Sequence, residues 1–259
     1  MLDPNNNQAG LDMTIIRITL GLMLLGGWSS GWSDEVRVAV ATNFIGTLEQ
    51  LISPFESNSG DTVVAMPGST GKHFAQIVNG APVDVFLAAD QARPIRLEAG
   101  GYAIPSSRFT YAIGQLVLWS PQEDFIDPDG RRLSLGGFRH LAIANPKLAP
   151  YGRAAKETLE ALQLWDDVQT ALVRGENIGQ AFQFVSTGNA ELGFVAASQI
   201  PDPAGSARGS WWVVPGEFYS PIEQQAVLLT DSPAARAFVE FLKADEARAI
   251  IRRYGYTTP

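Results

Sequence analysis

The sequence predicts an α/β protein with a largely parallel sheet beyond its N-terminal segment. After Asp34, short apolar runs alternate with amphipathic segments of helical period, and no Ser-rich or Pro-rich tether divides the chain. With 259 residues and 46% hydrophobic content, the chain can bury one large core or two modest ones. We therefore expect a globular protein in which any two lobes are joined by crossing strands instead of a flexible linker.

The strands are predicted from apolar runs that end at turn residues. The run 36–41 is followed by a polar turn, and the run 83–88 is almost fully apolar, as expected of a strand covered on both faces. A polar loop with Gly and Asp spans 121–137. In chain order, the predicted strands are 36–41, 62–66, 83–88, 111–119, 141–144, 193–196 and 224–230.

The helices are predicted from apolar spacing and from their end signals. Residues 45–58 place Leu48, Leu51 and Phe55 on one face and end before Gly60. The segment 72–78 ends at Asn79-Gly80, a stop signal of the same kind. The remaining predicted helices are 151–162, 178–186 and 234–254, the last as one helix or two.

The N-terminal segment is typical of a secretory signal. Arg17 precedes an apolar run over 18–27, and small residues such as Gly31 and Ser33 follow it. This run is short for a membrane span. The residues before Met13 are polar and acidic where a basic region is usual, which translation from Met13 would explain. We expect residues 1–33 to be a signal peptide with an upstream extension, outside the fold.

Charge and cysteine content exclude several classes of function. The net charge of -8 and pI near 4.8 argue against nucleic acid or an anionic membrane surface as the main partner. A small anion stays possible, because local N–H dipoles act at contact distance. The absence of Cys excludes a thiolate nucleophile, a disulfide framework and Cys-based metal sites.

Two polar turns have the layout of an anion site. Ala41-Thr42-Asn43 and Gly68-Ser69-Thr70-Gly71 each follow a predicted strand and open a predicted helix. Unpaired backbone N–H groups and polar side chains can therefore converge there on one negative ligand. For each hydroxyl or Asn taken alone, simple helix capping is the commoner explanation.

Catalytic and metal sites are disfavoured by the same residues. A phosphate-binding P-loop would need Gly where Met66 stands and Ser or Thr where His73 stands. No G-x-S-x-G elbow accompanies His73 or His140, and no ligand spacing joins them to carboxylates. We expect both histidines at the surface or in caps, and neither a catalytic residue nor a metal site.

Two further groups have structural explanations. Asp84 and Asp90 flank a buried strand, and we expect them to cap turns or pair with Arg93 or Arg96 instead of acting as acid and base. The Trp211-Trp212 pair is expected in a core or in lobe packing.

Several segments together carry a family resemblance. They are VAVATNFIGTLEQLISPF, PGSTGKHFAQIVNGAPVDVFLAAD, RFTYAIGQLVLWS, IANPKLAPYGRAAKETLEAL, ENIGQAFQFVSTGNAELGFVA and IIRRYGY. In this order and spacing they resemble the periplasmic molybdate-binding proteins of ABC transporters. The resemblance implies a periplasmic-binding-protein fold of two α/β lobes, with lobe I at 34–113 plus 225–259 and lobe II at 114–224. It also implies a monomeric, non-enzymatic receptor without a cofactor, which delivers molybdate or tungstate to a membrane permease.

The resemblance also implies which residues hold the oxyanion. Carried over position by position, the contacts fall on Thr42, Asn43, Thr70, Tyr151 and Ile178. Tyr151 and Ile178 would offer backbone N–H groups from helix starts, whereas Asn43 and Thr70 would add side-chain donors. Molybdenum would be bound only as its oxyanion.

This sequence departs from many members of that family. Asn43 stands where many have Ser, and Ala196 stands where many have a ligand-contacting Tyr. Asn43, with its extra NH₂, and Tyr151, which replaces a small residue of other members, are expected to restore the lost donor. Ser69 is a second candidate contact or a helix cap, and Lys72 is expected on a solvated face with His73. A receptor of the same fold for sulfate or phosphate is the alternative.

Overall fold

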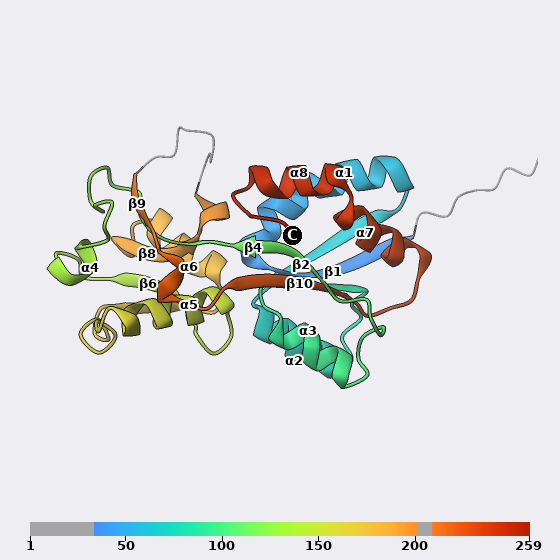
Figure 1. The fold of residues 1–259 in the computed structure, drawn as a ribbon, viewed down its shortest axis with the longest axis horizontal. Helices are drawn as coiled ribbons and strands as arrows, with labels where there is room; N and C mark the ends of the chain where they lie inside the picture. Colours follow the sequence, from blue (N-terminus) through green and yellow to red (C-terminus); the bar gives the residue numbers. More distant parts are fainter. Residues whose placement is uncertain (1–33, 201–208) are drawn as a thin grey trace, which may run out of the picture. The chain divides into compact units, whose positions relative to one another are not determined.

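A computed structural model describes residues 34–200 and 209–259. The predicted signal peptide at 1–33 lies outside the described residues. The chain forms two five-stranded sheets, in the orders β2-β1-β3-β10-β4 and β7-β6-β8-β5-β9. Helices pack on both sheets (Figure 1). The predicted α/β class is confirmed. We call the first sheet with its helices lobe I and the second sheet with its helices lobe II.

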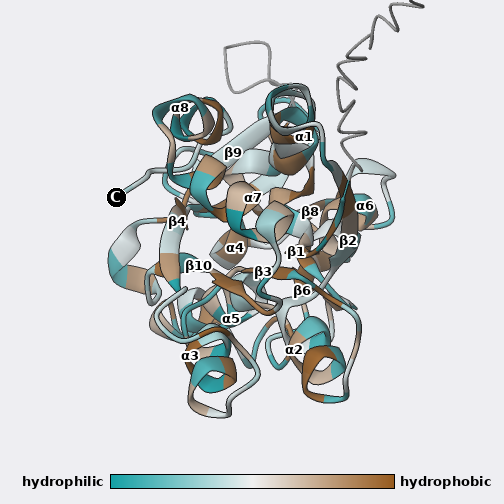
Figure 2. Ribbon diagram, turned by 90° about the vertical axis from the view of Figure 1, so that its right-hand side faces the viewer, coloured by the Kyte–Doolittle hydropathy of each residue, from teal (hydrophilic) through white to brown (hydrophobic). Residues whose placement is uncertain are grey.

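Lobe I is built on a mixed sheet between two helical layers. Its strands are β1 (Glu35–Ala41), β2 (Thr62–Gly68), β3 (Val85–Ala88), β4 (Phe109–Gly114) and β10 (Ile222–Leu228). Figure 1 shows α1 (Ile45–Ser59), α7 (Pro233–Lys243) and α8 (Asp245–Arg253) on one face, and α2 (Thr70–Val78) and α3 (Ala92–Ala99) on the other. Helices α1, α2 and α3 carry hydrophobic and hydrophilic residues on different sides (Figure 2), as burial of one face requires.

Lobe II repeats this layering on a second mixed sheet. Its strands are β5 (Leu116–Ser120), β6 (Leu141–Ala144), β7 (Leu172–Gly175), β8 (Leu192–Ala196) and β9 (Ser210–Val213). Leu118 and Leu141 pack in one core with Leu159 of α5 (Pro150–Ala161), and Trp119 packs in another with Val185 of α6 (Ile178–Ser186). The short elements are α4 (Arg132–Leu135), η2 (Ala197–Gln199) and η3 (Gly216–Phe218), and lobe I contains η1 (Thr42–Phe44) between β1 and α1.

One predicted strand is wrong in an informative way. The run 111–119 is two strands, because β4 ends at Gly114 in lobe I and β5 begins at Leu116 in lobe II. A side chain at Gly114 has no space, since its Cβ would lie 2.0 Å from the hydroxyl oxygen of Tyr151. The chain therefore passes between the lobes at Gln115, the single residue between the two strands.

The sheets are mixed, and not largely parallel as predicted. Strand β10 runs antiparallel to β3 and β4, and β5 runs antiparallel to β8 and β9. A strand that enters a lobe directly from the other lobe needs no crossover helix and so is not constrained to run parallel. Helices α3 and α4 and strands β7 and β9 were also not predicted. The residue limits proposed for the lobes stay a prediction.

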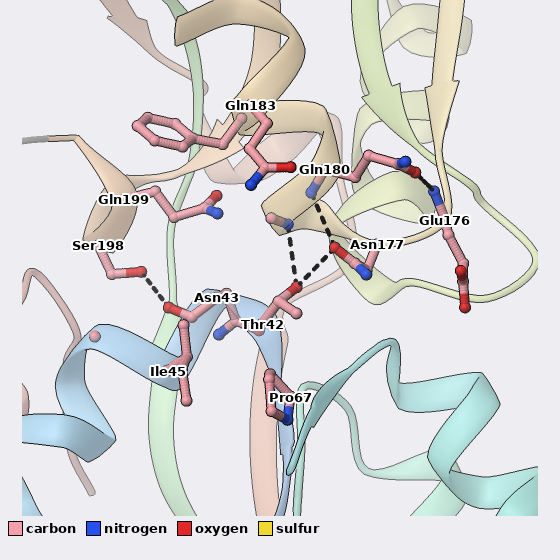
Figure 3. Close-up of a pocket in the computed structure, with 13 residues that line it drawn as sticks. Thr42, Asn43, Ile45, Pro67, Glu176, Asn177, Gln180, Gln183, Ser198 and Gln199 are labelled. Atoms are coloured by element: carbon pink, nitrogen blue, oxygen red, sulfur yellow. Dashed lines mark hydrogen bonds between the residues drawn. The ribbon is translucent and has the colours of Figure 1, made fainter. Parts of the chain in front are cut away.

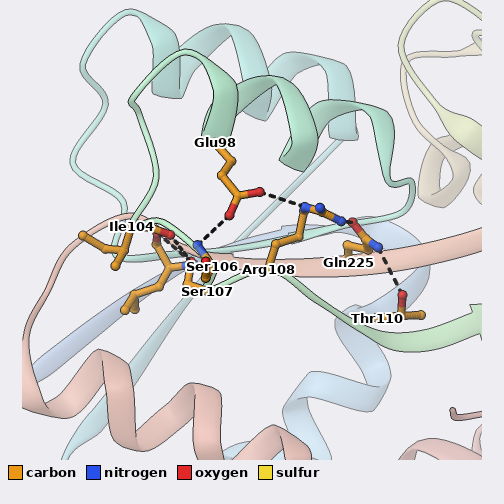
Figure 4. Close-up of polar contacts among 8 residues, drawn as sticks. Glu98, Ile104, Ser106, Ser107, Arg108, Thr110 and Gln225 are labelled. Carbon is orange, nitrogen blue, oxygen red and sulfur yellow. Dashed lines mark hydrogen bonds and ion pairs between the residues drawn. The ribbon is translucent and has the colours of Figure 1, made fainter.

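A polar chain fixes β10 beside β4 and α3 (Figure 4). Arg108 pairs with Glu98 at 3.1 Å and donates to Oε1 of Gln225 at 2.9 Å, and Gln225 donates to Oγ1 of Thr110 at 3.1 Å. The register of β10 shifts between Gln224 and Gln225. Gln224 is fully buried, and its side chain reaches the junction of the lobes. Among the described residues, no helix is long and apolar enough to cross a membrane.

Candidate functional site

The five residues singled out in the sequence line one small cavity between the lobes. Lobe I contributes the turns before α1 and α2, and lobe II contributes the starts of α5 and α6. The volume of the cavity is about 10 Å³, which is close to the minimum for one water molecule and excludes an organic solute. The full lining is Ala41, Thr42, Asn43, Gly68, Ser69, Thr70, Ala89, Ala149, Pro150, Tyr151, Asn177 and Ile178.

The lining carries no charged side chain, so its polarity comes from helix starts. Helix α2 begins at Thr70, α5 at Pro150 and α6 at Ile178. The first N–H groups of a helix have no acceptor within the helix, and the helix dipole places partial positive charge there. Pro150 suits the first position of α5 because it lacks an N–H, and so Tyr151 is the first donor. The arrangement attracts an anion without a counter-charge.

Thr70 is the lobe I side chain best placed to donate into the cavity. It is almost fully buried, and its Oγ1 accepts from the N–H of Ala89 at 3.1 Å. Its own hydroxyl proton has no acceptor among the hydrogen bonds of residues 34–200 and 209–259. Ser69 instead caps α2, because its Oγ accepts from the N–H of Lys72 at 3.4 Å. Of its two predicted roles, the structure shows the cap.

Asn43 does not offer the side-chain donor predicted for it. Its Nδ2 donates to Oε1 of Gln224 at 2.7 Å and to the hydroxyl of Tyr256 at 3.0 Å. These bonds use both amide hydrogens, so the donor that Asn43 has left for a ligand is its backbone N–H. Its carbonyl oxygen accepts from Tyr256 at 2.8 Å and from Ser198 at 2.9 Å. The Asn43 side chain therefore fixes the turn to β10 and to the C-terminal segment, and its backbone carbonyl joins the turn to Ser198 of lobe II.

Tyr151 fills the junction beneath the cavity. Its ring is 1% exposed, and its hydroxyl accepts from Nε2 of Gln224 at 3.5 Å. Burial raises the pKa of Tyr151 well above its usual value, so the phenol stays neutral and keeps its proton. Burial also raises the pKa of the neighbouring Tyr256 to about 12. The group formed by Asn43, Gln224 and the two tyrosines thus supports the cavity without carrying charge.

Direct bonds hold the lobes together around the cavity (Figure 3). Oγ1 of Thr42 accepts from the N–H of Gly179 at 3.1 Å and donates to Oδ1 of Asn177 at 3.3 Å. In the first turn of α2, the N–H of Gly71 donates to the carbonyl of Leu148 at 2.8 Å. A Cβ at Gly71 would lie 2.9 Å from that same oxygen, so the approach requires glycine.

Of the two neighbours of the second turn, one lies on a solvated face as expected and the other does not. Lys72 is exposed and forms an ion pair with Glu176 of lobe II at 2.9 Å, whereas His73 is buried. The His73 ring fills the space beneath Gly68, whose Cβ would lie 2.6 Å from Nε2. Burial lowers the pKa of His73, which favours the neutral ring. His140 is exposed, as expected.

The carboxylates beside β3 have structural partners. Asp84 pairs with Arg37 at 3.3 Å, and Asp90 pairs with Arg93, as one of the two predicted partners. Arg96 lies over the ring of Phe74 instead. Among the described residues, no group of three or more His, Cys, Asp or Glu side chains is placed to hold a metal ion.

A larger hollow of about 660 Å³ adjoins the cavity (Figure 3). It shares Thr42, Asn43 and Asn177 with the cavity, and the amide side chains of Gln180, Gln183 and Gln199 also line it. These shared residues form the wall between the two spaces. Sequence reasoning did not identify Gln224 and Tyr256, because β10 and the C-terminus are distant from the motif turns along the chain.

Comparisons with known proteins agree with this architecture. Residues 36–257 match the family described as bacterial extracellular solute-binding protein. The molybdate-binding protein ModA of Azotobacter vinelandii is 48% identical over 92% of this chain and 95% of its own length. The molybdate-binding protein ModA of Rhodobacter capsulatus is 43% identical, over 98% of each chain. The solved periplasmic molybdate-binding protein of Azotobacter vinelandii superposes with a TM-score of 0.84 at 45% identity, covering 86% of this chain and 99% of that one.

Proposed function

Because the chain belongs to the bacterial extracellular solute-binding protein family, we propose that it captures molybdate or tungstate and delivers the oxyanion to a membrane ABC permease. The observation that carries this proposal is the small, uncharged cavity in which helix starts from both lobes meet. The relatives named for molybdate binding supply the ligand class, and the cavity supplies a physical reason for it.

The cavity recognises an anion by donation alone. Backbone N–H groups donate hydrogen bonds and cannot accept them, so a fully deprotonated dianion satisfies the cavity. Phosphate carries a proton at neutral pH, and its O–H group would face backbone N–H groups that cannot accept a hydrogen bond. The preference for molybdate and tungstate over the smaller sulfate is inferred from the relatives named for molybdate binding. This mechanism needs no acid, base, cofactor or bound metal ion, and the receptor performs no chemistry.

The proposed contacts are divided between backbone and side chain. Thr70 gives its hydroxyl proton and the first N–H of α2, whereas Thr42, Asn43, Tyr151 and Ile178 give backbone N–H groups. Lobe I, proposed as 34–113 plus 225–259, closes on lobe II, proposed as 114–224, when the oxyanion binds. The protein acts as a periplasmic monomer after removal of residues 1–33.

A calorimetric titration of the secreted protein tests the proposal. Molybdate and tungstate should each bind at least about a hundredfold more tightly than sulfate and phosphate, a difference of roughly 3 kcal/mol. The sulfate and phosphate titrations are the internal controls, because all four ions are tetrahedral. Tighter binding of sulfate, or no heat with molybdate, would show that the cavity serves another solute.

A further inference from the structure

A second hollow lies in lobe II, and it is lined by cationic side chains, unlike the uncharged cavity between the lobes. It has a volume of about 590 Å³ and lies among the loop after β6, one face of α5, the segment that follows α5, and β7. Its wall contains four of the 19 Lys and Arg residues of a chain with net charge -8, and no carboxylate. We call it the basic pocket, and its lining is Asn145, Pro146, Lys147, Arg153, Lys156, Trp165 and Arg174.

Two of the four cations already have partners. Lys156 pairs with Glu160 and lies over the ring of Trp165, 5.3 Å from its centre. Arg153 pairs with Glu157 at 3.7 Å. In each pair, the residues are four positions apart on α5, an arrangement that favours contact on a helix surface. These two side chains contribute their aliphatic stems to the wall, and the paired carboxylates partly offset their positive charge.

The other two cations have no ion pair among the residues that the structure describes. Lys147 is exposed on the loop after β6, and its side chain has no bonded partner there. Arg174 on β7 donates from Nη2 to Oε1 of Gln169 at 2.8 Å, which leaves other guanidinium hydrogens for a ligand. The pocket thus keeps an unused capacity for negative charge.

Trp165 decides what kind of anion fits. Its half-buried ring is the aromatic part of the wall, and the aliphatic stems of the Lys and Arg side chains add further apolar surface. Exposed ion pairs contribute little alone, so a bare inorganic ion would stay hydrated here. A volume of several hundred Å³ with apolar walls and a few charged groups is typical of sites for organic molecules.

We propose that the basic pocket binds a small aromatic anion, whose ring packs beside Trp165 and Lys156 and whose carboxylate or phosphate is met by Lys147 and Arg174. This site goes beyond the proposed oxyanion cavity and does not depend on it. The two spaces are separated by the loop whose Leu148 carbonyl accepts the N–H of Gly71, and they share no lining residue.

Phenyl phosphate is the probe. Inorganic phosphate, which has only the anionic group, and benzyl alcohol, which has only the aromatic ring, are the control ligands. Calorimetry with the intact protein should show phenyl phosphate binding at least tenfold more tightly than either half. Arg174→Gln and Trp165→Leu should each weaken it at least fivefold. Molybdate affinity should be unchanged in both variants, which separates this test from that of the cavity.

Matched controls lie on the same lobe. Arg139→Gln removes another exposed arginine, and Trp211→Leu removes another partly exposed tryptophan. Neither should change phenyl phosphate binding, and circular dichroism should show that all four variants are folded. The proposal is overturned if phenyl phosphate binds no better than inorganic phosphate, or if the control variants weaken it as much as Arg174→Gln and Trp165→Leu do.

Discussion

The two lobes bring different chemistry to the same cavity. Lobe I presents turns of Thr, Asn and Ser, whereas lobe II presents Pro150, Tyr151 and Ile178. Yet most of the polar side chains in lobe I are engaged elsewhere. Asn43 donates to Gln224 and Tyr256, and Thr42 bonds to lobe II. Both lobes therefore face the cavity mainly with backbone N–H groups, and the polarity of a residue is a poor guide to its contribution.

This difference indicates where each lobe is sensitive to substitution. In lobe II the donors are backbone N–H groups at the starts of α5 and α6. Their positions depend on how each helix packs against the neighbouring strand. In lobe I one side chain, Thr70, adds a donor of its own. Changes in helix position should therefore have the largest effects, followed by loss of the Thr70 hydroxyl, and then by changes of apolar side chains.

The largest effect is expected from Gly152→Ala in lobe II. A Cβ there would lie 2.3 Å from the carbonyl oxygen of Ala144 on β6, a backbone atom that cannot move aside. The start of α5 must then shift away from the cavity. Loss of two hydrogen bonds at roughly 1.5 kcal/mol each predicts about a hundredfold weaker molybdate binding by calorimetry.

Gly46→Ala in lobe I is the matched control for this prediction. It lies in α1, and its Cβ would meet nothing within 4 Å. Its oxyanion affinity should equal that of the unchanged protein. Equal affinities for Gly152→Ala and Gly46→Ala would show that the position of α5 does not determine binding.

A smaller and more selective effect should separate Thr70→Val from Ile178→Val. Both substitutions leave a β-branched residue and its backbone N–H at the start of a helix. Thr70→Val removes a hydroxyl donor and also leaves the N–H of Ala89 without its acceptor, so molybdate should bind about tenfold more weakly. Ile178→Val should change the affinity less than about threefold. The reverse order would mean that the side chain in lobe II, and not its N–H, contacts the ligand.

Much of the fold was accessible from the sequence, because its strands and helices have clear apolar periods. Helix α6 lies at its predicted limits, and β1 and α1 differ from prediction by a residue at one end. The division of 111–119 into two strands was not accessible, since a strand that changes sheets keeps the same apolar pattern. The missed strands β7 and β9 are short and carry Arg174 or exposed Trp211, which weakens that pattern.

The site was predicted less completely than the fold. The polar turns after two strands indicated an anion site, because such turns are local features, and the family resemblance added the helix starts at Tyr151 and Ile178. It did not indicate which way a side chain points. The Asn43 amide turns toward Gln224 and Tyr256, which are distant in sequence, and His73 turns beneath Gly68. Such orientations depend on tertiary contacts, for which the sequence around each turn contains no signal.

The smallest expected effect concerns the support of the second lobe I turn by His73. Burial lowers its pKa in the folded protein, while the unfolded chain keeps a value of about 6.5. Below that pH the unfolded state binds more protons, so the contribution of His73 to stability is present above pH about 6.5 and falls as the solution is acidified. Urea unfolding from pH 7.5 to 5.0 measures this, with His140→Gln as the control for removing an exposed histidine. The stability advantage over His73→Gln should shrink toward acid pH. An advantage that stays constant or grows would mean that this ring is charged in the folded protein, and that the lobe I turn does not rest on a neutral support.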